Sequence, residues 1–365
     1  MNVNFSFFVF FFLWVPFLGV GQSEEVKKLK LFEGLEMGAF QVGFKTLQSD
    51  SMTVHYWYPT KRKKGNEFLM GDYISRTYGE RVDKTKLLSY LFCGDSLYYK
   101  EGLMGVVMEA SMNAYPLSKP ADGIYPLVLW GVGRETLFYQ SVLSEYLTSH
   151  GYVVAVAVPF VEYKSPWEVS TGEKMDVLQG QANLLNQTIT ALNTLPFVDR
   201  SKTALISWSY GGESVVLTQQ SNPDVDAVIG LGSLNLDRGM YLGKSLPLHF
   251  TESLRRCPYL ILSESGDAIF NPSHLHPQSC YITMTTLSQG NFNTPEGHIS
   301  DLLHLEKVQP WTQTGSQSHR GYEALCKITL TYLNTRFYHN DQSFFDAVNT
   351  LLMEYPYGMG EVYCR

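Results

Sequence analysis

A serine at position 209 stands where an apolar run is expected to turn directly into a helix. Residues 205–212 read LISWSYGG, so the serine follows a strand-like run and has small neighbours. A tight strand-to-helix turn of this kind exposes a nucleophilic hydroxyl at the carboxyl end of a sheet and aims the next backbone N–H at the reaction centre. The usual pattern is G-x-S-x-G, and here Ser207 replaces the first glycine. We therefore predict that Ser209 is a nucleophile; the alternative is a serine that only caps the helix.

A serine hydroxyl needs a histidine base, and that base needs a carboxylate to orient it. His298 lies in the segment EGHISD, beyond the last expected strand, and is the predicted base. Asp267 follows a glycine after the apolar run 259–262 and is the predicted acid, with Asp237 and Glu264 as alternatives. The resulting chain order of serine, acid and histidine is the one expected for a nucleophile on such a turn.

An oxyanion site is predicted from two backbone amides, because acyl transfer needs donors aimed at the oxygen that becomes negative. Residues 131–133 read GVG and directly follow the short apolar run 125–130. We expect the N–H groups of Val132 and Tyr210 to point at the same oxygen. Without Ser209, the glycines would indicate only a turn at the end of a strand.

Side chains near these residues supply candidates for a substrate pocket. Aromatic residues occur more often in a core than in a pocket, so these assignments are weaker than the catalytic ones. No cysteine pair has the C-x-x-C spacing of a zinc or redox site, and we predict neither a metal nor a cofactor. The candidate pocket residues are Trp130, Trp208, Tyr210, Phe160, Trp167, Phe270 and His274.

Alternating strand and helix patterns must position these residues. Continuous apolar runs at 152–158 and 203–207 indicate strands buried on both faces. Helical spacing is present at 137–150, 181–195, 211–220 and 320–337. This alternation predicts an α/β fold with a mostly parallel central sheet of about eight strands and helices on both faces. Two leading strand patterns, 38–44 and 52–58, have no helix between them and predict an antiparallel start.

Residues 1–21 differ from the rest of the chain and resemble a secretory signal peptide. Residues 5–20 are almost wholly apolar, and small residues precede the expected cleavage near Gly21/Gln22. The alternative is an uncleaved membrane anchor, but the run is short for a bilayer span and Pro16 interrupts it. We therefore expect a secreted or periplasmic protein without stable membrane insertion after cleavage.

Residues 22–365 are predicted to form a single catalytic domain, because they contain neither an internal repeat nor a linker. Helical and loop insertions are expected near 67–118 and 160–180. The formal net charge is -7, and the one dense basic run, at 61–64, is interpreted as a solvated turn. Nucleic-acid binding needs clustered lysine and arginine, so no nucleic-acid partner is expected.

The chain has five cysteines, and export would permit disulfides among them. An odd number leaves at least one thiol free or paired between chains. Cys257 and Cys280 each stand just before a strand-like run. If those strands are parallel neighbours, the two cysteines could form a disulfide, which is a hypothesis for the structure to test.

Together these segments resemble the α/β-hydrolase superfamily, in the branch of dienelactone hydrolases and platelet-activating-factor acetylhydrolase-like esterases. The segments similar to the acetylhydrolase-like group are 38–42, 54–59, 125–133 and 146–154. Residues 197–199 and 265–272 resemble segments of dienelactone hydrolases. The resemblance covers roughly residues 35–337, and Ser207 and Trp130 depart from the usual pattern.

The resemblance implies a serine hydrolase that cleaves a carboxylic ester through an acyl-enzyme, with Ser209, His298 and Asp267 as its triad. The acetylhydrolases carry their acid after the strand that here ends at Leu231, where this chain has Gly232 and then a serine. This favours Asp267, the acid position of the dienelactone hydrolases, and argues against a phospholipid substrate. A small-molecule or glycan-linked ester is expected. The alternatives are a catalytically weak or inactive binding protein of the same fold and a peptidase of that fold.

Overall fold

A computed structural model describes most of the chain between residues 29 and 364. The described residues are 29–48, 52–78, 103–131, 137–159, 171–208, 211–234, 256–264, 276–299, 302, 317–338, 343–356 and 358–364. The predicted signal peptide, residues 1–21, lies outside them, as do residues 79–102 of the first predicted insertion and 160–170 of the second.

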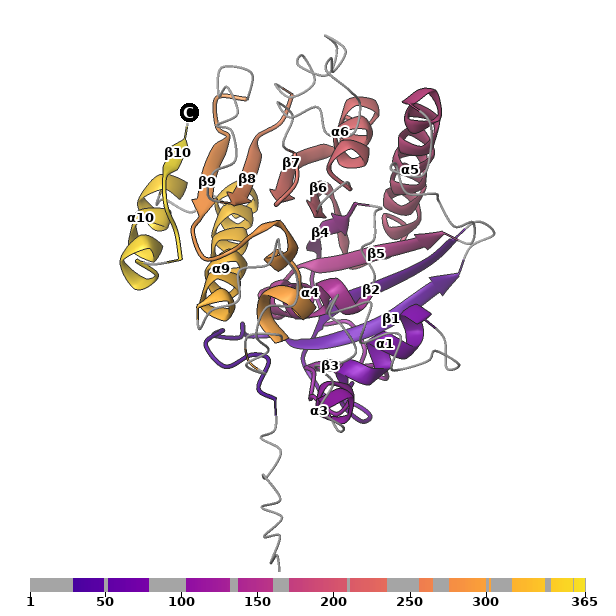
Figure 1. Cartoon of the computed structure of the whole chain (residues 1–365). Helices are drawn as coiled ribbons and strands as arrows, with labels where there is room; N and C mark the ends of the chain where they lie inside the picture. Colours follow the sequence, from indigo (N-terminus) through magenta and orange to yellow (C-terminus); the bar gives the residue numbers. More distant parts are fainter. Residues whose placement is uncertain are drawn as a thin grey trace, which may run out of the picture.

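Ten strands of the described chain form one sheet, in the order β10-β9-β8-β7-β6-β4-β5-β2-β1-β3 (Figure 1). The strands are β1 Gln41–Gln48, β2 Met52–Thr60, β3 Ala114–Tyr115, β4 Tyr125–Trp130, β5 Val153–Pro159, β6 Val198–Trp208, β7 Val225–Leu231, β8 Tyr259–Glu264, β9 Cys280–Met284 and β10 Val362–Cys364. The six strands from β5 to β9 in this order are parallel, whereas β2 is antiparallel to both β1 and β5. The mostly parallel sheet and its antiparallel start are confirmed. The sheet exceeds the predicted eight strands by β3 and β10, which are too short to leave a sequence pattern.

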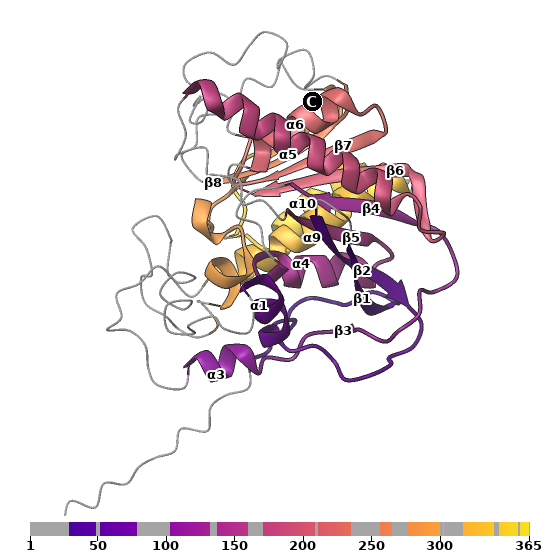
Figure 2. The same ribbon diagram turned by 90° about the vertical axis from the view of Figure 1, so that its right-hand side faces the viewer.

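Helices cover both faces of the sheet, as predicted (Figure 2). The helices are α1 Met70–Tyr78, α3 Leu103–Met108, α4 Leu137–Ser149, α5 Thr171–Leu192, α6 Gly211–Ser221, α9 Ser318–Phe337 and α10 Phe344–Glu354. Successive strand residues serve opposite faces: Leu129 belongs to the core shared with α5 and α6, and Trp130 to the core shared with α4 and α9. None of the described helices is both long enough and apolar enough to span a bilayer.

The buried carboxyl group of Glu145 joins α1 to the sheet and to α4. Glu145 of α4 accepts hydrogen bonds from the Tyr73 hydroxyl of α1 at 2.5 Å and from the Asn113 backbone N–H at 2.6 Å. The Trp57 indole of β2 donates in turn to the Tyr73 oxygen at 2.7 Å. Burial raises the pKa of Glu145 to about 8, although the hydrogen bonds from Tyr73 and Asn113 act in the opposite direction.

This raised pKa predicts a pH-dependent stability. Glu145 is protonated more readily in the folded than in the unfolded chain, so its contribution is complete below about pH 4.5 and is lost as the pH rises through about 8. The full shift corresponds to at most about 5 kcal/mol. Denaturant unfolding at pH 5 and pH 8 should show a smaller difference in Glu145→Gln than in the natural chain. Equal differences in the two proteins would contradict this role for Glu145.

The disulfide of the described chain joins Cys280 to Cys364, and the predicted Cys257–Cys280 pair is wrong. Cys280 and Cys364 lie directly opposite each other on the antiparallel strands β9 and β10, with their Cα atoms 4.1 Å apart. On β8, the residue opposite Cys280 is Leu260, so Cys257 lies three residues too early in the chain to reach it. Cys257 and Cys326 are buried free thiols.

Candidate active site

The predicted nucleophile lies between two described elements. Strand β6 ends at Trp208 and helix α6 begins at Gly211, so Ser209 and Tyr210 are the two residues that connect them. Both residues are outside the described part of the chain. The strand before them and the helix after them are confirmed, and the prediction for the serine depended on these two elements.

The predicted oxyanion strand is the direct neighbour of β6. Strands β4 and β6 are parallel, with Trp130 opposite Ile206, and the Gly131 N–H donates to the Ile206 carbonyl at 2.7 Å. A Cβ atom at Gly131 would lie 2.8 Å from Cγ1 of Val215 and 3.0 Å from the Gly211 carbonyl oxygen, both in α6. The end of β4 therefore lies against the start of α6, where little space remains for a side chain. Val132 follows immediately, outside the described residues.

Strands β4 and β6 also flank the point at which the strand order reverses. The chain runs from β4 through α4 to β5 on one side, and then through α5 to β6 on the other side of β4. The helices that follow the two strands, α4 and α6, cover opposite faces of the sheet (Figure 2). In open α/β sheets, ligands bind outside the carboxyl ends of the strands at such a switch point. Ser209 and Val132 follow the two strands that border it.

The strands beyond β6 lead toward the predicted acid. Strand β8 ends at the partly buried Glu264, and Asp267 comes three residues later. Both Asp267 and the alternative Asp237 lie outside the described residues. After β7 the chain has Gly232 and then Ser233, whose hydroxyl lies 2.9 Å from that of Ser207. The three described residues that directly follow β7 include no carboxylate, and the choice between Asp267 and Asp237 stays a prediction.

The segment after β9 returns to the carboxyl ends of the strands. It forms a 3-10 turn, η3 Gln289–Asn291, and a π-helical turn, η4 Thr294–Ile299. Between them, Phe292 packs on Gly232, where a Cβ atom would lie 2.8 Å from its ring. Gly232 follows β7, so this contact brings the segment to the end of that strand. The turn η4, which contains His298, packs against α4 and α9.

His298 is fully buried, and its ring is held on two sides. Its Nε2 atom lies 2.7 Å from the carbonyl oxygen of Leu31, and the ring stacks on Tyr322 with centroids 5.1 Å apart. A carbonyl only accepts, so Nε2 donates the hydrogen, and in the neutral ring Nδ1 carries the lone pair. A triad histidine uses one nitrogen for the nucleophile and the other for the acid. His298 must therefore release Leu31 before it can contact both.

The N-terminal segment that supplies this carbonyl was not among the predicted site residues. Leu29, Leu31 and Leu35 are all buried, which ties the segment to the body of the protein. The segment continues to Gly38, whose N–H donates to the Ser149 hydroxyl at 2.9 Å. The three spaced leucines are a sequence signal for burial, but they do not indicate which side chain they cover.

Two predicted pocket residues are described, and both pack toward α4. Trp130 is fully buried, and its indole donates to the Ser144 hydroxyl at 3.1 Å, which makes it a core residue. Trp208 is nearly buried and stacks on Tyr139 with centroids 5.6 Å apart. The other candidates lie outside the described residues: Tyr210, Phe160, Trp167, Phe270 and His274.

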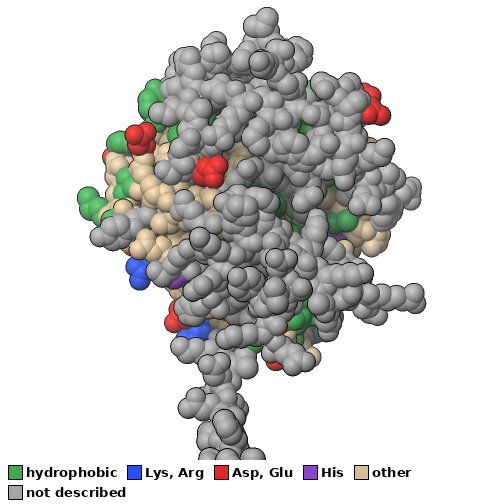
Figure 3. All heavy atoms as spheres, in the orientation of Figure 1, with side chains coloured by type: hydrophobic (Ala, Val, Ile, Leu, Met, Phe, Trp, Pro, Cys, Tyr) green, Lys and Arg blue, Asp and Glu red, His purple; other side chains and the backbone are tan. Residues whose placement is uncertain are grey.

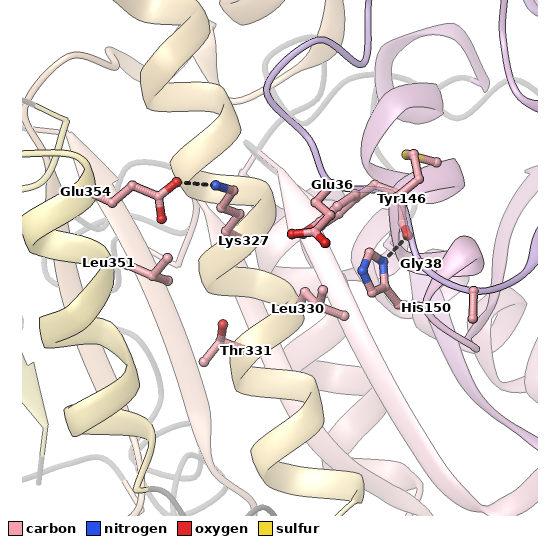
Figure 4. A pocket seen from close by; sticks show the side chains of 11 residues that line it. Glu36, Gly38, Tyr146, His150, Lys327, Leu330, Thr331, Leu351 and Glu354 are labelled. Carbon is pink, nitrogen blue, oxygen red and sulfur yellow. Dashed lines mark hydrogen bonds and ion pairs between the residues drawn. The ribbon is translucent and has the colours of Figure 1, made fainter.

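An open cavity of about 530 Å³ lies between residues 36–39, the end of α4, α9 and α10 (Figure 4). On one side, Nδ1 of His150 donates to the Tyr146 carbonyl at 2.9 Å, and on the other Lys327 pairs with Glu354. The end of α4 leads directly into the start of β5. The cavity thus lies at the amino ends of the parallel strands, away from the strand ends that carry the candidate catalytic residues.

Acidic and basic side chains of the described residues are scattered over the face seen in Figure 3, and one of each lies side by side at the lower left. One exposed pair elsewhere in the described chain joins Lys61 and Asp122 at 2.8 Å. Among the residues that the structure describes, no three His, Cys, Asp or Glu side chains are grouped so that they could hold a metal ion.

The chain resembles known proteins in its fold but not in its sequence. No family model and no curated protein sequence matches it. By structure it matches 510 solved chains, among them a ferulic acid esterase from Streptomyces cinnamoneus. That match has a TM-score of 0.61 and 19% sequence identity, and covers 84% of this chain and 93% of the esterase. At this identity the likeness concerns the fold, which supports many chemistries. Together with the strand order, it establishes an α/β-hydrolase fold for this chain.

Proposed function

We propose that this protein is a serine esterase that hydrolyses carboxylic esters. The observation that carries the proposal is the adjacency of two strand ends: Ser209 follows β6, and Val132 follows its hydrogen-bonded parallel neighbour β4. A nucleophile and an oxyanion donor that follow neighbouring strands can serve the same carbonyl group. The fold likeness to a ferulic acid esterase supports the same reaction class.

In the proposed reaction, the Ser209 hydroxyl oxygen attacks the ester carbonyl carbon and gives its proton to His298. The N–H groups of Val132 and Tyr210 stabilise the negative oxygen of the tetrahedral intermediate. When the intermediate collapses, the bond to the alcohol oxygen breaks and His298 returns the proton to the leaving alcohol. Water then attacks the acyl-enzyme by the same steps, which releases the acid and restores Ser209.

Asp267 is the acid in this proposal because it follows β8, two strands beyond β6 in the sheet. Engagement of His298 by both Asp267 and Ser209 requires the ring to leave the Leu31 carbonyl, which holds Nε2 at 2.7 Å. The described conformation then corresponds to a resting state. Catalytic hydrogen bonds often form fully only once substrate is bound.

The proposed substrate is a small-molecule or glycan-linked ester. One protein of similar fold is a ferulic acid esterase, so esters of aromatic acids are the first class to assay, beside short acyl esters. We also propose that the protein is exported, with cleavage near Gly21/Gln22. The disulfide between Cys280 and Cys364 supports export, because such bonds persist mainly in oxidising compartments.

A fluorophosphonate probe tests the nucleophile directly, because it forms a covalent bond with an activated serine. We expect the folded protein to be labelled on the peptide that contains Ser209, and a heat-unfolded sample to remain unlabelled. A folded protein that takes no label would overturn the proposal and favour a binding role. A labelled protein that cleaves aminoacyl amides but no ester from a panel of acyl and aromatic esters would indicate a peptidase instead.

A further inference from the structure

Two buried serines, Ser207 and Ser233, form a hydrogen-bonded pair, and Ser207 is two residues before the candidate nucleophile. Ser207 lies near the end of β6 and Ser233 follows β7, and both side chains are buried. Their hydroxyl oxygens are 2.9 Å apart. The Ser233 hydroxyl also lies within donating distance of the Ser207 carbonyl oxygen, at 3.2 Å, and the Ser207 hydroxyl donates to the Ile229 carbonyl at 3.3 Å. Both hydroxyls therefore have partners inside the protein, which a buried polar group requires.

The turn that carries Ser233 has an uncommon backbone. Gly232 has φ of 55° and Leu234 has φ of 65°, and the left-handed region is sparsely populated by residues other than glycine. The Leu234 side chain is buried against Gly230, where a Cβ atom would lie 2.7 Å from its Cδ1 atom. Packing thus holds the turn in a conformation that the leucine backbone would rarely adopt alone. Strained turns of this kind are found preferentially at functional sites.

The same turn touches both flanks of the nucleophile connection. On one flank Ser233 bonds to Ser207, two residues before Ser209. On the other flank the turn packs on the first turn of α6: a Cβ atom at Gly212 would lie 3.0 Å from the Leu234 backbone nitrogen and 3.3 Å from the Ser233 Cβ atom. The described residues before and after Ser209 are therefore braced by one short segment.

We propose that Ser207 and Ser233 position the nucleophile through the hydrogen bond between their hydroxyl groups. This inference rests on the proposed function of Ser209. The common motif has glycine at position 207 and needs no partner there. In this chain a hydroxyl occupies the position, and its hydrogen bond to Ser233 fixes the end of β6 relative to the turn after β7. Neither serine is assigned contact with substrate; both act by holding the end of β6, which leads into Ser209.

Kinetics of single and double variants test this positioning role. Ser233→Ala should lower kcat and the rate of fluorophosphonate labelling together by about tenfold, because a small displacement of a nucleophile is costly. KM should stay within about twofold, since substrate binding is unchanged. Ser207→Ala should act similarly, and the double variant should lose little more than either single variant because both remove the same interaction.

Ser279→Ala is the matched control. Its hydroxyl is also buried and accepts a hydrogen bond, from the Tyr259 N–H at 2.9 Å, but it lies at the amino ends of β8 and β9. The control should lose stability without a change in kcat. Folded Ser233→Ala with unchanged kcat and labelling rate would overturn the positioning role while leaving Ser209 as the nucleophile. If the natural chain takes no label at Ser209, the proposed function fails and this inference fails with it.

Discussion

Replacement of Ser209 by alanine should lower kcat for ester hydrolysis by at least about 10⁴-fold, with the fold retained. Without the hydroxyl no acyl-enzyme can form, and only transition-state binding at the oxyanion site would remain to assist water. The free energy of unfolding should change little, because the Ser209 hydroxyl is predicted to point out of the sheet rather than into the core. The measurement is kcat on the best substrate of the ester panel, together with thermal unfolding of the same samples.

Ser221→Ala provides the comparison for this result, because Ser221 is an exposed residue at the far end of the same helix, α6. It should retain full activity and full probe labelling. Substantial ester turnover by a pure Ser209→Ala protein would show that the chemistry resides elsewhere in the chain.

A glutamine at position 298 should separate the chemical role of His298 from its structural role. Glutamine can place an amide N–H near the position of Nε2 and so keep the bond to Leu31, but it cannot accept a proton during catalysis. We expect His298→Gln to fold and to lose about 10²–10⁴-fold in kcat, the range typical of a missing general base. His298→Ala should lose activity to a similar degree and also lose stability, because it leaves the buried Leu31 carbonyl unpaired.

The two variants and a thermal unfolding curve decide the assignment. A His298→Gln protein with nearly full kcat would mean that His298 is a packing residue beneath the N-terminal segment. In that case the base must be sought among the later histidines, of which His319 is the second residue of α9. Equal losses of activity and stability in both variants would also argue for a packing role.

The alternation of patterns in the sequence predicted the central part of this fold well. Buried parallel strands such as β5 leave continuous apolar runs that can be recognised locally, and the expected strand and helix around Ser209 are both present. The two-residue β3 and three-residue β10 leave no such run, because they join the sheet only through partners far away in the chain.

The details of the candidate site were less accessible for the same reason. The contact of His298 with Leu31 spans 267 positions in the chain. The pairing of Ser207 with Ser233 depends on a turn in which Leu234 has a left-handed backbone conformation, and no local sequence pattern predicts that conformation. The disulfide was mispredicted because two cysteines before neighbouring strands look alike in sequence until their register is known. Local composition therefore specified the elements, whereas the contacts between remote residues required the structure.

The last strand has a consequence for how the protein can be produced. Strand β10 covers the outer edge of β9, where Thr283 exchanges backbone hydrogen bonds with Gly360 and Glu361, and the Cys280–Cys364 bond keeps this short strand in place. In a reducing cytosol that bond would be open, and β10 could detach. The row of N–H and C=O groups along β9 would then be a template for pairing with another molecule, the usual origin of edge-to-edge aggregation. Expression through an oxidising compartment would preserve the disulfide and keep β10 on the edge of β9.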